Sequence, residues 1–344
     1  MEPVEALRRI AFMLERAHEP TYRVRAFRKA ADLVEQTPPG ELADRARDGT
    51  LTAMSGIGKV TALVIEEALR GERPVYLRRL EATEGESMDE SASALRSALK
   101  GDLHTHSDWS DGGSPIAEMA ETARSLGHEY IALTDHSPRL TVANGLSAER
   151  LRRQLDVVAE LNRELAPFRV LTGIEVDILD DGSLDQDPEL LDRLDVVVAS
   201  VHSKLRMDRV AMTERMVAAI ANPRVNVLGH CTGRIVKAGG KRGRLRPESE
   251  FDARLVFDAC VAYDVAVEIN SRPERLDPPK RLLRLAVEAG CRFAIDSDAH
   301  APGQLDWQPY GCERAALCAV APDQVVNTMS ASALLDWTKS GTKG

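Results

Sequence analysis

The sequence is poor in aromatic residues, in histidine and in long apolar segments. Aromatic residues make up 4% of its 344 residues, and eight residues are histidine. No apolar run approaches the about 20 residues that a membrane-spanning helix needs. The first ten residues, MEPVEALRRI, place acids where a signal peptide would be basic. We therefore expect a cytoplasmic protein with no membrane partner.

Cysteine is also scarce, and its spacing excludes two common uses. The five cysteines are an odd number without a C-x-x-C pair, so neither a disulfide framework nor a cysteine-based zinc site is expected. The net charge is −9, but residues 1–85 carry as many basic as acidic side chains. The excess negative charge therefore follows residue 85, and local basic patches or metal ions could still attract a polyanion such as DNA.

The patterns that are present divide the chain into two segments. Residues 1–84 show apolar residues at helical spacing, as in PVEALRRIAFMLERA, and predict a small all-helical domain. Residues 85–100 are rich in serine, alanine and acids and are predicted to be a linker with a short helix near Leu95. Residues 101–340 form the second predicted domain.

In the second domain, short β-branched runs alternate with amphipathic segments. The seven strand-like runs are DLHTH, YIALTD, RVLTGIEVDI, LDVVVASVH, VNVLGH, VAVEIN and RFAIDSD. Seven repeats of strand then helix predict an α/β fold, a parallel βα barrel.

Six of the eight histidines lie at or just after the ends of these runs, interleaved with carboxylates. They are His104, His106, His136, His202, His230 and His300, accompanied by Glu175 and Asp298. The C-terminal ends of the strands in a βα barrel meet at one rim, where active sites are built. Imidazole and carboxylate bind Zn, Mn or Fe, and this many ligands exceeds one ion. The sequence predicts a multinuclear metal centre.

Taken in order, the motifs DLHTHSDWSDG, LTDHS, GIEVDI, SVHSK, LGHC and DSDAH closely resemble the PHP family, named for polymerase and histidinol phosphatase. The resemblance covers residues 101 to about 338. It implies a distorted, TIM-like barrel of seven strands, (βα)7, with three divalent metal ions.

The resemblance also implies a ligand set for each ion. His104, His106, Glu175 and Asp298 would hold the first metal, and Glu175 would bridge to a second held by His202 and His230. Asp111, His136 and His300 would hold the third. Glu175, Asp298, His300 and Arg272 are the candidate catalytic residues.

Several divalent ions suit the hydrolysis of a phosphate ester through a hydroxide that bridges metals, because they lower the pKa of bound water and neutralise phosphate oxygens. A metal-dependent amidohydrolase, which also begins with His-x-His on a barrel strand, is an alternative. Those enzymes usually bridge two metals with a lysine carbamate, whereas this chain offers Glu175 there.

The helical segment contains a second motif, GIGKVT, with Gly56 and Gly58 directly before a helix. Such a helix N-terminus can bind phosphate, although a tight helix–helix turn has the same pattern. Together with the preceding helices it resembles the helix-hairpin-helix domain of bacterial family X DNA polymerases, which also carry a PHP domain. The resemblance implies sequence-independent contacts to DNA phosphates by Gly56, Gly58, Lys59 and Thr61, aided by a basic run that contains Arg23, Arg25, Arg28 and Lys29. A solvated helix face is the alternative for that run.

Two departures from the polymerases limit this resemblance. Val60 and Val64 occupy the positions of the lyase lysine, so lyase activity is not expected, and the residues between the two domains are too few for a polymerase core. A basic loop after His230, with Lys241, Arg242 and Arg244, is expected to overhang the metals and attract DNA.

The resulting hypothesis is a metal-dependent DNA phosphoesterase, a 3′-to-5′ exonuclease or 3′-end processing enzyme in DNA repair. A phosphatase for a small monoester such as histidinol phosphate and a non-catalytic DNA-binding scaffold remain the alternatives. The metal, the physiological substrate and the oligomeric state stay open.

Overall fold

The computed structural model describes residues 1–82, 88–237 and 245–340. It divides into two compact units, Met1–Ser87 and Met88–Gly344. Among the helices in these described ranges, none has the length and apolar character to span a membrane.

The first unit is built from helices, as predicted. They are α1 (Pro3–Arg16), α2 (Thr21–Gln36), α3 (Pro39–Arg47), α4 (Lys59–Leu69) and α5 (Val75–Glu81), with a 3-10 turn at Leu51–Ala53. In α1, Leu7, Ile10 and Leu14 recur every three or four residues and are fully buried. This single apolar stripe packs on α2 and α4 and gives the unit a core of its own.

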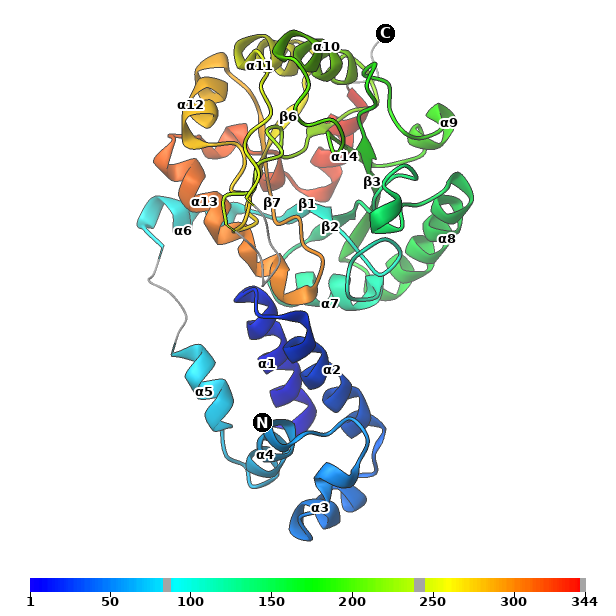
Figure 1. Cartoon of the computed structure of the whole chain (residues 1–344), viewed down its shortest axis with the longest axis vertical. Helices are drawn as coiled ribbons and strands as arrows, with labels where there is room; N and C mark the ends of the chain where they lie inside the picture. The colour runs from blue at the N-terminus through cyan, green and yellow to red at the C-terminus, as the bar shows by residue number, and fades with distance from the viewer. Residues whose placement is uncertain (83–87, 238–244, 341–344) are drawn as a thin grey trace. The chain divides into compact units, whose positions relative to one another are not determined.

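The second unit is a nearly closed barrel of seven parallel strands in chain order, which confirms the predicted fold (Figure 1). The strands are β1 (Gly101–Thr105), β2 (Tyr130–Leu133), β3 (Arg169–Asp177), β4 (Val196–Ser200), β5 (Val227–Leu228), β6 (Ala266–Asn270) and β7 (Phe293–Asp296). The first and last strands meet through a parallel bridge between Thr105 and Ala299, where the His106 amide donates to the Ala299 carbonyl at 2.8 Å.

Helices cover the outside of the barrel (Figure 1). They are α7 (Ile116–Ser125), α8 (Ala148–Leu165), α9 (Pro188–Leu191), α10 (Arg209–Ile220), α11 (Ala253–Ala262), α12 (Lys280–Ala289), α13 (Gln308–Leu317) and α14 (Ala331–Ser340). Because both faces of the strands are covered, their residues are nearly all buried, which explains the continuous β-branched runs in the sequence.

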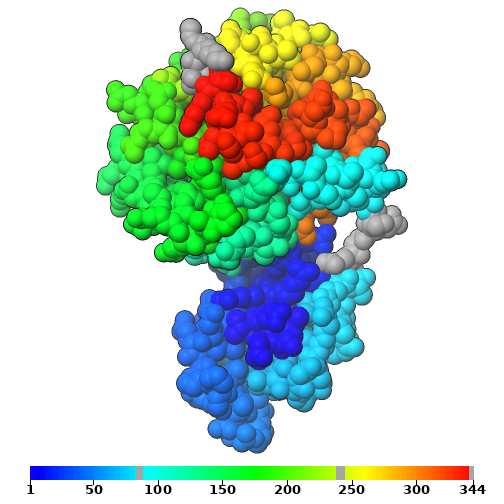
Figure 2. All heavy atoms as spheres, turned by 180° about the vertical axis from the view of Figure 1, so that it is seen from behind, coloured from blue at the N-terminus to red at the C-terminus, as the bar shows by residue number. Residues whose placement is uncertain are grey.

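A short helix, α6 (Glu90–Ala98), lies in the stretch expected to be a linker. Asp89 caps it by accepting a hydrogen bond from the Ala92 amide, and Ala92 and Leu95 are buried in the main barrel core. The helix packs against α13, and Figure 2 shows its cyan surface beside the orange and red C-terminal segments. Residues 90–98 are therefore part of the barrel unit.

The barrel interior is divided into an apolar and a polar end. Leu103, Tyr130, Leu171 and Val198 fill the apolar end, where Leu334 of α14 joins them. The C-terminal ends of the strands form the other end, and there the interior is lined with histidines and carboxylates. Strand order alone thus brings the predicted site residues to one rim.

Candidate metal centre

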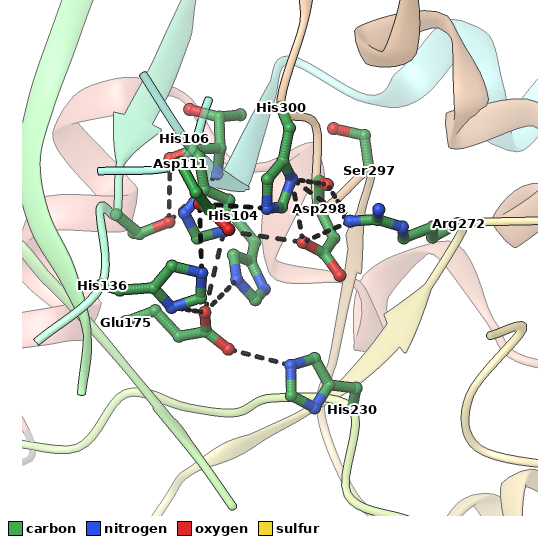
Figure 3. A network of polar contacts seen from close by, with 12 residues as sticks. His104, His106, Asp111, His136, Glu175, His230, Arg272, Ser297, Asp298 and His300 are labelled. Atoms are coloured by element: carbon green, nitrogen blue, oxygen red, sulfur yellow. Dashed lines mark hydrogen bonds and ion pairs between the residues drawn. The ribbon is translucent and has the colours of Figure 1, made fainter. Parts of the chain in front are cut away.

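The predicted ligands face one another at the C-terminal rim, where Figure 3 labels eight of them, and the ninth, His202, lies 3.1 Å from Glu175. His104 lies in β1 and Glu175 in β3, whereas the other seven follow strand ends or lie in the loop after β1. Several of them line a cavity of about 390 Å³. The members of this cluster, which we call the metal centre, are His104, His106, Asp111, His136, Glu175, His202, His230, Asp298 and His300.

Glu175 is at the middle of the metal centre and is 1% exposed. One carboxylate oxygen lies 2.9 Å from His230 Nε2 and 3.1 Å from His202 Nε2. The other lies 2.8 Å from His136 Nδ1 and 3.4 Å from His104 Nε2. Both oxygens are therefore shared among imidazoles, the arrangement that a bridging carboxylate requires.

Asp111 and Asp298 complete the other side of the cluster. Asp111 Oδ1 lies 3.4 Å from the Nε2 atoms of both His136 and His300. Asp298 Oδ1 lies 3.5 Å from His106 Nε2. Asp298 adopts a left-handed backbone at φ 53°, a conformation that aspartate tolerates better than most residues. This turn directs its carboxylate back into the barrel.

The ligand atoms form three groups, and the atoms inside each group lie within 4.8 Å of one another. The groups are His104, His106 and Glu175; His136, Glu175 and His202; and His106, Asp111, His136 and His300. The first belongs to the set predicted for the first metal, and the last contains the whole set predicted for the third. The groups share members, so the structure contains a continuous metal-binding cluster.

The donor atoms fit cations, because many of them contact only other charged groups and lack a hydrogen bond. Within the described ranges, both oxygens of Glu175 and both ring nitrogens of His106 and His202 are buried without a hydrogen bond. Buried polar atoms without a partner destabilise a fold unless an ion or water satisfies them.

The charges around Glu175 and His106 also suit metal binding. Burial alone would raise the pKa of Glu175, but His202, His104 and His136 hold it well below its ordinary value, so the carboxylate stays ionised. Burial and the neighbouring His300 and His136 lower the pKa of His106 well below its ordinary value. Against burial, Glu175 raises the pKa of His104, His136 and His202, so metal ions would take the place of protons on these imidazoles.

Sequence reasoning did not identify a second layer of polar residues behind the ligands. Glu268 is fully buried, and its carboxylate contacts His104 Nδ1 at 2.6 Å and accepts a bond from the His230 amide at 2.5 Å. Asn270 donates to Asp298 Oδ2 at 3.1 Å, and Asp177 lies 3.4 Å from His202 Nδ1. The signal was present, since Glu268 and Asn270 alternate in β6 as the histidines do in β1.

Arg272, the predicted catalytic cation, lies at the edge of the metal centre. Its Nη1 atom is 3.6 Å from Asp298 Oδ1 and 3.2 Å from His300 Nδ1. A second arginine that the sequence did not single out, Arg275, lies 3.2 Å from Asp298 Oδ2. Two guanidinium groups thus flank one carboxylate ligand.

The candidate DNA contacts of the first unit have different environments. Gly56 has φ 117°, which glycine adopts readily, and Gly58 precedes α4 as its cap with Lys59 exposed beside it. Thr61 is 3% exposed; its hydroxyl donates to the Gly58 carbonyl and accepts from the Gly58 amide. The Thr61 side chain therefore stabilises the turn through its hydroxyl, and the predicted phosphate contact of Thr61 stays a prediction.

The basic run is likewise divided between internal and exposed side chains. Arg28 pairs with the buried Glu15 at 2.7 Å, and Arg23 contacts Glu19 and the Tyr76 hydroxyl. Arg25 and Lys29 are exposed. The predicted contacts Lys241, Arg242 and Arg244 lie outside the described residues.

Comparison with known proteins identifies both units. The PHP domain model matches residues 102–272, and the helix-hairpin-helix domain model matches residues 1–74. The DNA polymerase/3′-5′ exonuclease PolX of Bacillus subtilis is 40% identical over 232 residues, which are 67% of this chain and 40% of that relative. The chain therefore spans well under half of that protein.

Shorter relatives align over most of their length. A protein named "Probable phosphatase" from Thermoanaerobacter is 30% identical over 58% of this chain and 78% of its own. The solved histidinol phosphate phosphatase of Lactococcus lactis, complexed with zinc, L-histidinol and phosphate, is 18% identical with a TM-score of 0.44, covering 64% of this chain and 92% of that one. The sequence matches confirm the predicted enzyme class, a metal-dependent hydrolase of phosphate esters. The chain belongs to the PHP family, with a helix-hairpin-helix domain before its barrel.

Proposed function

We propose that the protein hydrolyses phosphodiester bonds of DNA as a 3′-to-5′ exonuclease or 3′-end processing enzyme in repair. The observation that carries the proposal is the convergence of six histidines and two aspartates around Glu175, in a chain that also has a helix-hairpin-helix domain. The 40% identity over 232 residues to the DNA polymerase/3′-5′ exonuclease PolX of Bacillus subtilis supports DNA as the substrate.

Three divalent ions are the proposed occupants, with the ligand sets that the PHP motifs imply. His104, His106 and Asp298 would hold the first ion, and His202 and His230 the second, with Glu175 shared between them. Asp111, His136 and His300 would hold the third. When bound, such ions lower the pKa of water and neutralise charge that develops on phosphate oxygens.

The chain's own residues would orient the substrate and the ligands. Arg272 lines the cavity beside Asp298 and His300, where its guanidinium could donate to a non-bridging phosphate oxygen. Asn270 and Arg275 both contact Oδ2 of the Asp298 carboxylate and so fix its orientation. Exposed Lys59 and the turn at Gly56 and Gly58 would contact backbone phosphates without reading sequence.

The decisive experiment is a parallel assay of the protein loaded with Mn, Zn or Fe. The substrates are 3′-labelled DNA, 3′-phosphorylated DNA and histidinol phosphate. We expect release of mononucleotides or phosphate from DNA 3′ ends. Turnover of histidinol phosphate alone would contradict the proposal and favour a small-molecule phosphatase, which the similarity to shorter proteins named as phosphatases supports.

Replacing the central carboxylate should separate a metal enzyme from a DNA-binding scaffold. Glu175→Gln removes one anionic oxygen shared by several imidazoles, so we expect activity to fall by at least about a hundredfold and the metal content per chain to decrease. Asp181→Asn, in an exposed loop after the same strand, is the control and should leave both unchanged. Full activity and full metal content in Glu175→Gln would exclude this residue from the site.

A further inference from the structure

A second cavity, of about 670 Å³, lies outside the metal centre and contains none of its nine ligands. Its charged lining residues are Arg209, Arg234, Arg246, Arg281, Glu248 and Glu250. Four guanidinium groups thus face two carboxylates in a chain whose net charge is −9. We call this space the arginine cavity.

A short antiparallel pairing of the segments around Ile235 and Arg246, which we call the ribbon, separates the arginine cavity from the metal centre. Ile235 pairs with Arg246 through two backbone hydrogen bonds of 2.9 and 3.0 Å. Ile235 lines the cavity of the metal centre, whereas its neighbours Arg234 and Val236 line the arginine cavity. This alternation follows from extended backbone, and it places the two spaces on opposite sides of the same segment.

Arginine contacts also connect the two spaces. Arg234 Nε donates to the carbonyl of Arg275 at 3.0 Å, and the side chain of Arg275 lies 3.2 Å from Asp298 in the metal centre. A ligand that crosses the ribbon would therefore remain in contact with positive charge on both sides.

The positive charge of the arginine cavity is only partly neutralised. Arg281 and Arg234 both pair with Glu248, the latter at 3.5 Å, and Arg209 pairs with Asp252 at 2.7 Å. Arg246 is different, because its side chain donates to the Gly233 carbonyl at 2.5 Å and has no carboxylate partner within the described ranges. Asp277 attracts Arg246 without forming an ion pair with it, and the Asp277 carboxylate already accepts a hydrogen bond from the Thr232 hydroxyl at 2.6 Å. A half-buried guanidinium that makes no ion pair favours an added anion.

A buried hydroxyl adds a second donor. Ser249 lines the arginine cavity and is 6% exposed, and its Oγ atom has no hydrogen-bond partner among the described residues. A guanidinium and a hydroxyl in one cavity suit the oxygens of a phosphate group, and the volume leaves room for the attached sugar.

We propose that the arginine cavity binds a second phosphate of the DNA strand whose end lies in the metal centre. This inference rests on the proposed function, and it predicts that longer strands are held better than a dinucleotide. Free inorganic phosphate has the same chemistry, so the experiment must separate the two sources.

The test measures hydrolysis of oligothymidylates of two and eight nucleotides by the metal-loaded full chain. Arg246→Gln and Arg281→Gln each remove one cavity cation, and Arg284→Gln on the same α12 removes an exposed arginine outside the cavity. We expect each cavity variant to raise KM for the octamer by about tenfold, as lost charged hydrogen bonds do, with the dinucleotide unchanged. Arg284→Gln should behave as wild type. Arg281 is exposed, so its variant stays informative if Arg246→Gln does not fold.

An octamer KM at the wild-type value in the folded cavity variants would overturn the inference, as would an equal loss on both substrates. Calorimetric titration of inorganic phosphate into the metal-free protein tests the other source. Phosphate binding that weakens in the variants without a change in octamer KM would assign the cavity to free phosphate and overturn its role for DNA.

If wild type does not cleave DNA, the proposed function fails, and octamer binding by fluorescence anisotropy then tests the cavity alone. Equal affinities of wild type and variants would overturn it.

Discussion

Glu268 shows how a residue that contacts no substrate can determine a metal site. Glu268 is fully buried, and its carboxylate contacts the imidazole ring of His104 and the backbone amide of His230. It also accepts a hydrogen bond from the Asn270 side chain at 3.2 Å. Its contact with His104 Nδ1 leaves Nε2 of the same ring turned toward Glu175. The carboxylate therefore fixes both the orientation of the imidazole and the nitrogen that is available to a metal.

Glu268→Gln should weaken metal binding without unfolding the barrel. The amide keeps the shape of the side chain but replaces one of two accepting oxygens with a donor, so either His104 or the His230 amide loses its partner. We expect metal affinity to fall about 10- to 100-fold. Titration of metal-free protein with Mn, followed by calorimetry, measures it. Unchanged affinity would mean that packing alone orients His104.

His128 is the buried histidine outside the metal centre, and it predicts an acid-sensitive barrel. Burial, together with Arg96, lowers the pKa of His128 from 6.5 to about 3. Between these values the unfolded chain binds a proton that the native chain does not, so stability is lost as the pH falls from 6.5 toward 3.

The prediction is tested by urea unfolding of metal-free wild type and His128→Gln at about pH 7.5 and about pH 5. The variant has no group to titrate at this position, so the decrease in its free energy of unfolding between the two pH values should be smaller. Equal decreases in both proteins would show that His128 does not contribute to acid destabilisation.

At the scale of elements, the loop from β1 to α7 carries Asp111, followed by two adjacent glycines, and depends on one of them. A Cβ atom on Gly112 would lie 2.6 Å from the carbonyl carbon and oxygen of Ser107, whereas one on Gly113 would meet the His300 carbonyl oxygen at an ordinary 3.5 Å. Only the first position requires glycine on steric grounds.

Gly112→Ala should therefore move the loop and displace Asp111 from His136 and His300, whereas Gly113→Ala is its matched control. We expect Gly112→Ala to lose roughly tenfold or more in activity and to retain less metal, because ligand positions must hold to within a fraction of an ångström. Crystal structures or metal analysis of the two variants would check it. Equal behaviour of the pair would show that the loop adapts.

The elements also show where sequence reasoning succeeds. Buried parallel strands need continuous β-branched runs, so all seven strands could be predicted. Strand ends in a barrel converge, so eight of the nine candidate ligands could be grouped, whereas Asp111 was assigned through the resemblance to the PHP motifs. The burial of Thr61 and the packing of α6 on α13 could not be predicted, since both depend on tertiary contacts. The arginine cavity is also tertiary, because residues such as Arg209 and Arg281 come from separate helices.

At the scale of the whole molecule, each unit has its own hydrophobic core. The core of the first unit contains residues of the N-terminal helices, and the barrel's clusters begin at Ala92. No ligand of the metal centre belongs to the first unit. Under the proposed function, the first unit would bind DNA and the second would hydrolyse it.

Deleting residues 1–87 should therefore raise KM for DNA about tenfold or more and leave the hydrolysis of a small chromogenic phosphodiester unchanged, because backbone contacts contribute affinity and all candidate metal ligands lie in the barrel. Lys59→Glu in the full chain provides a milder form of the same test, since it reverses one exposed charge at the hairpin without removing any core residue. Lys59→Glu should also raise KM for DNA, and KM should depend less steeply on salt concentration than in wild type. Glu66→Gln on the same helix is the control. If the deletion lowers turnover of the small substrate as much as that of DNA, the first unit stabilises the barrel, and its role in holding DNA is contradicted.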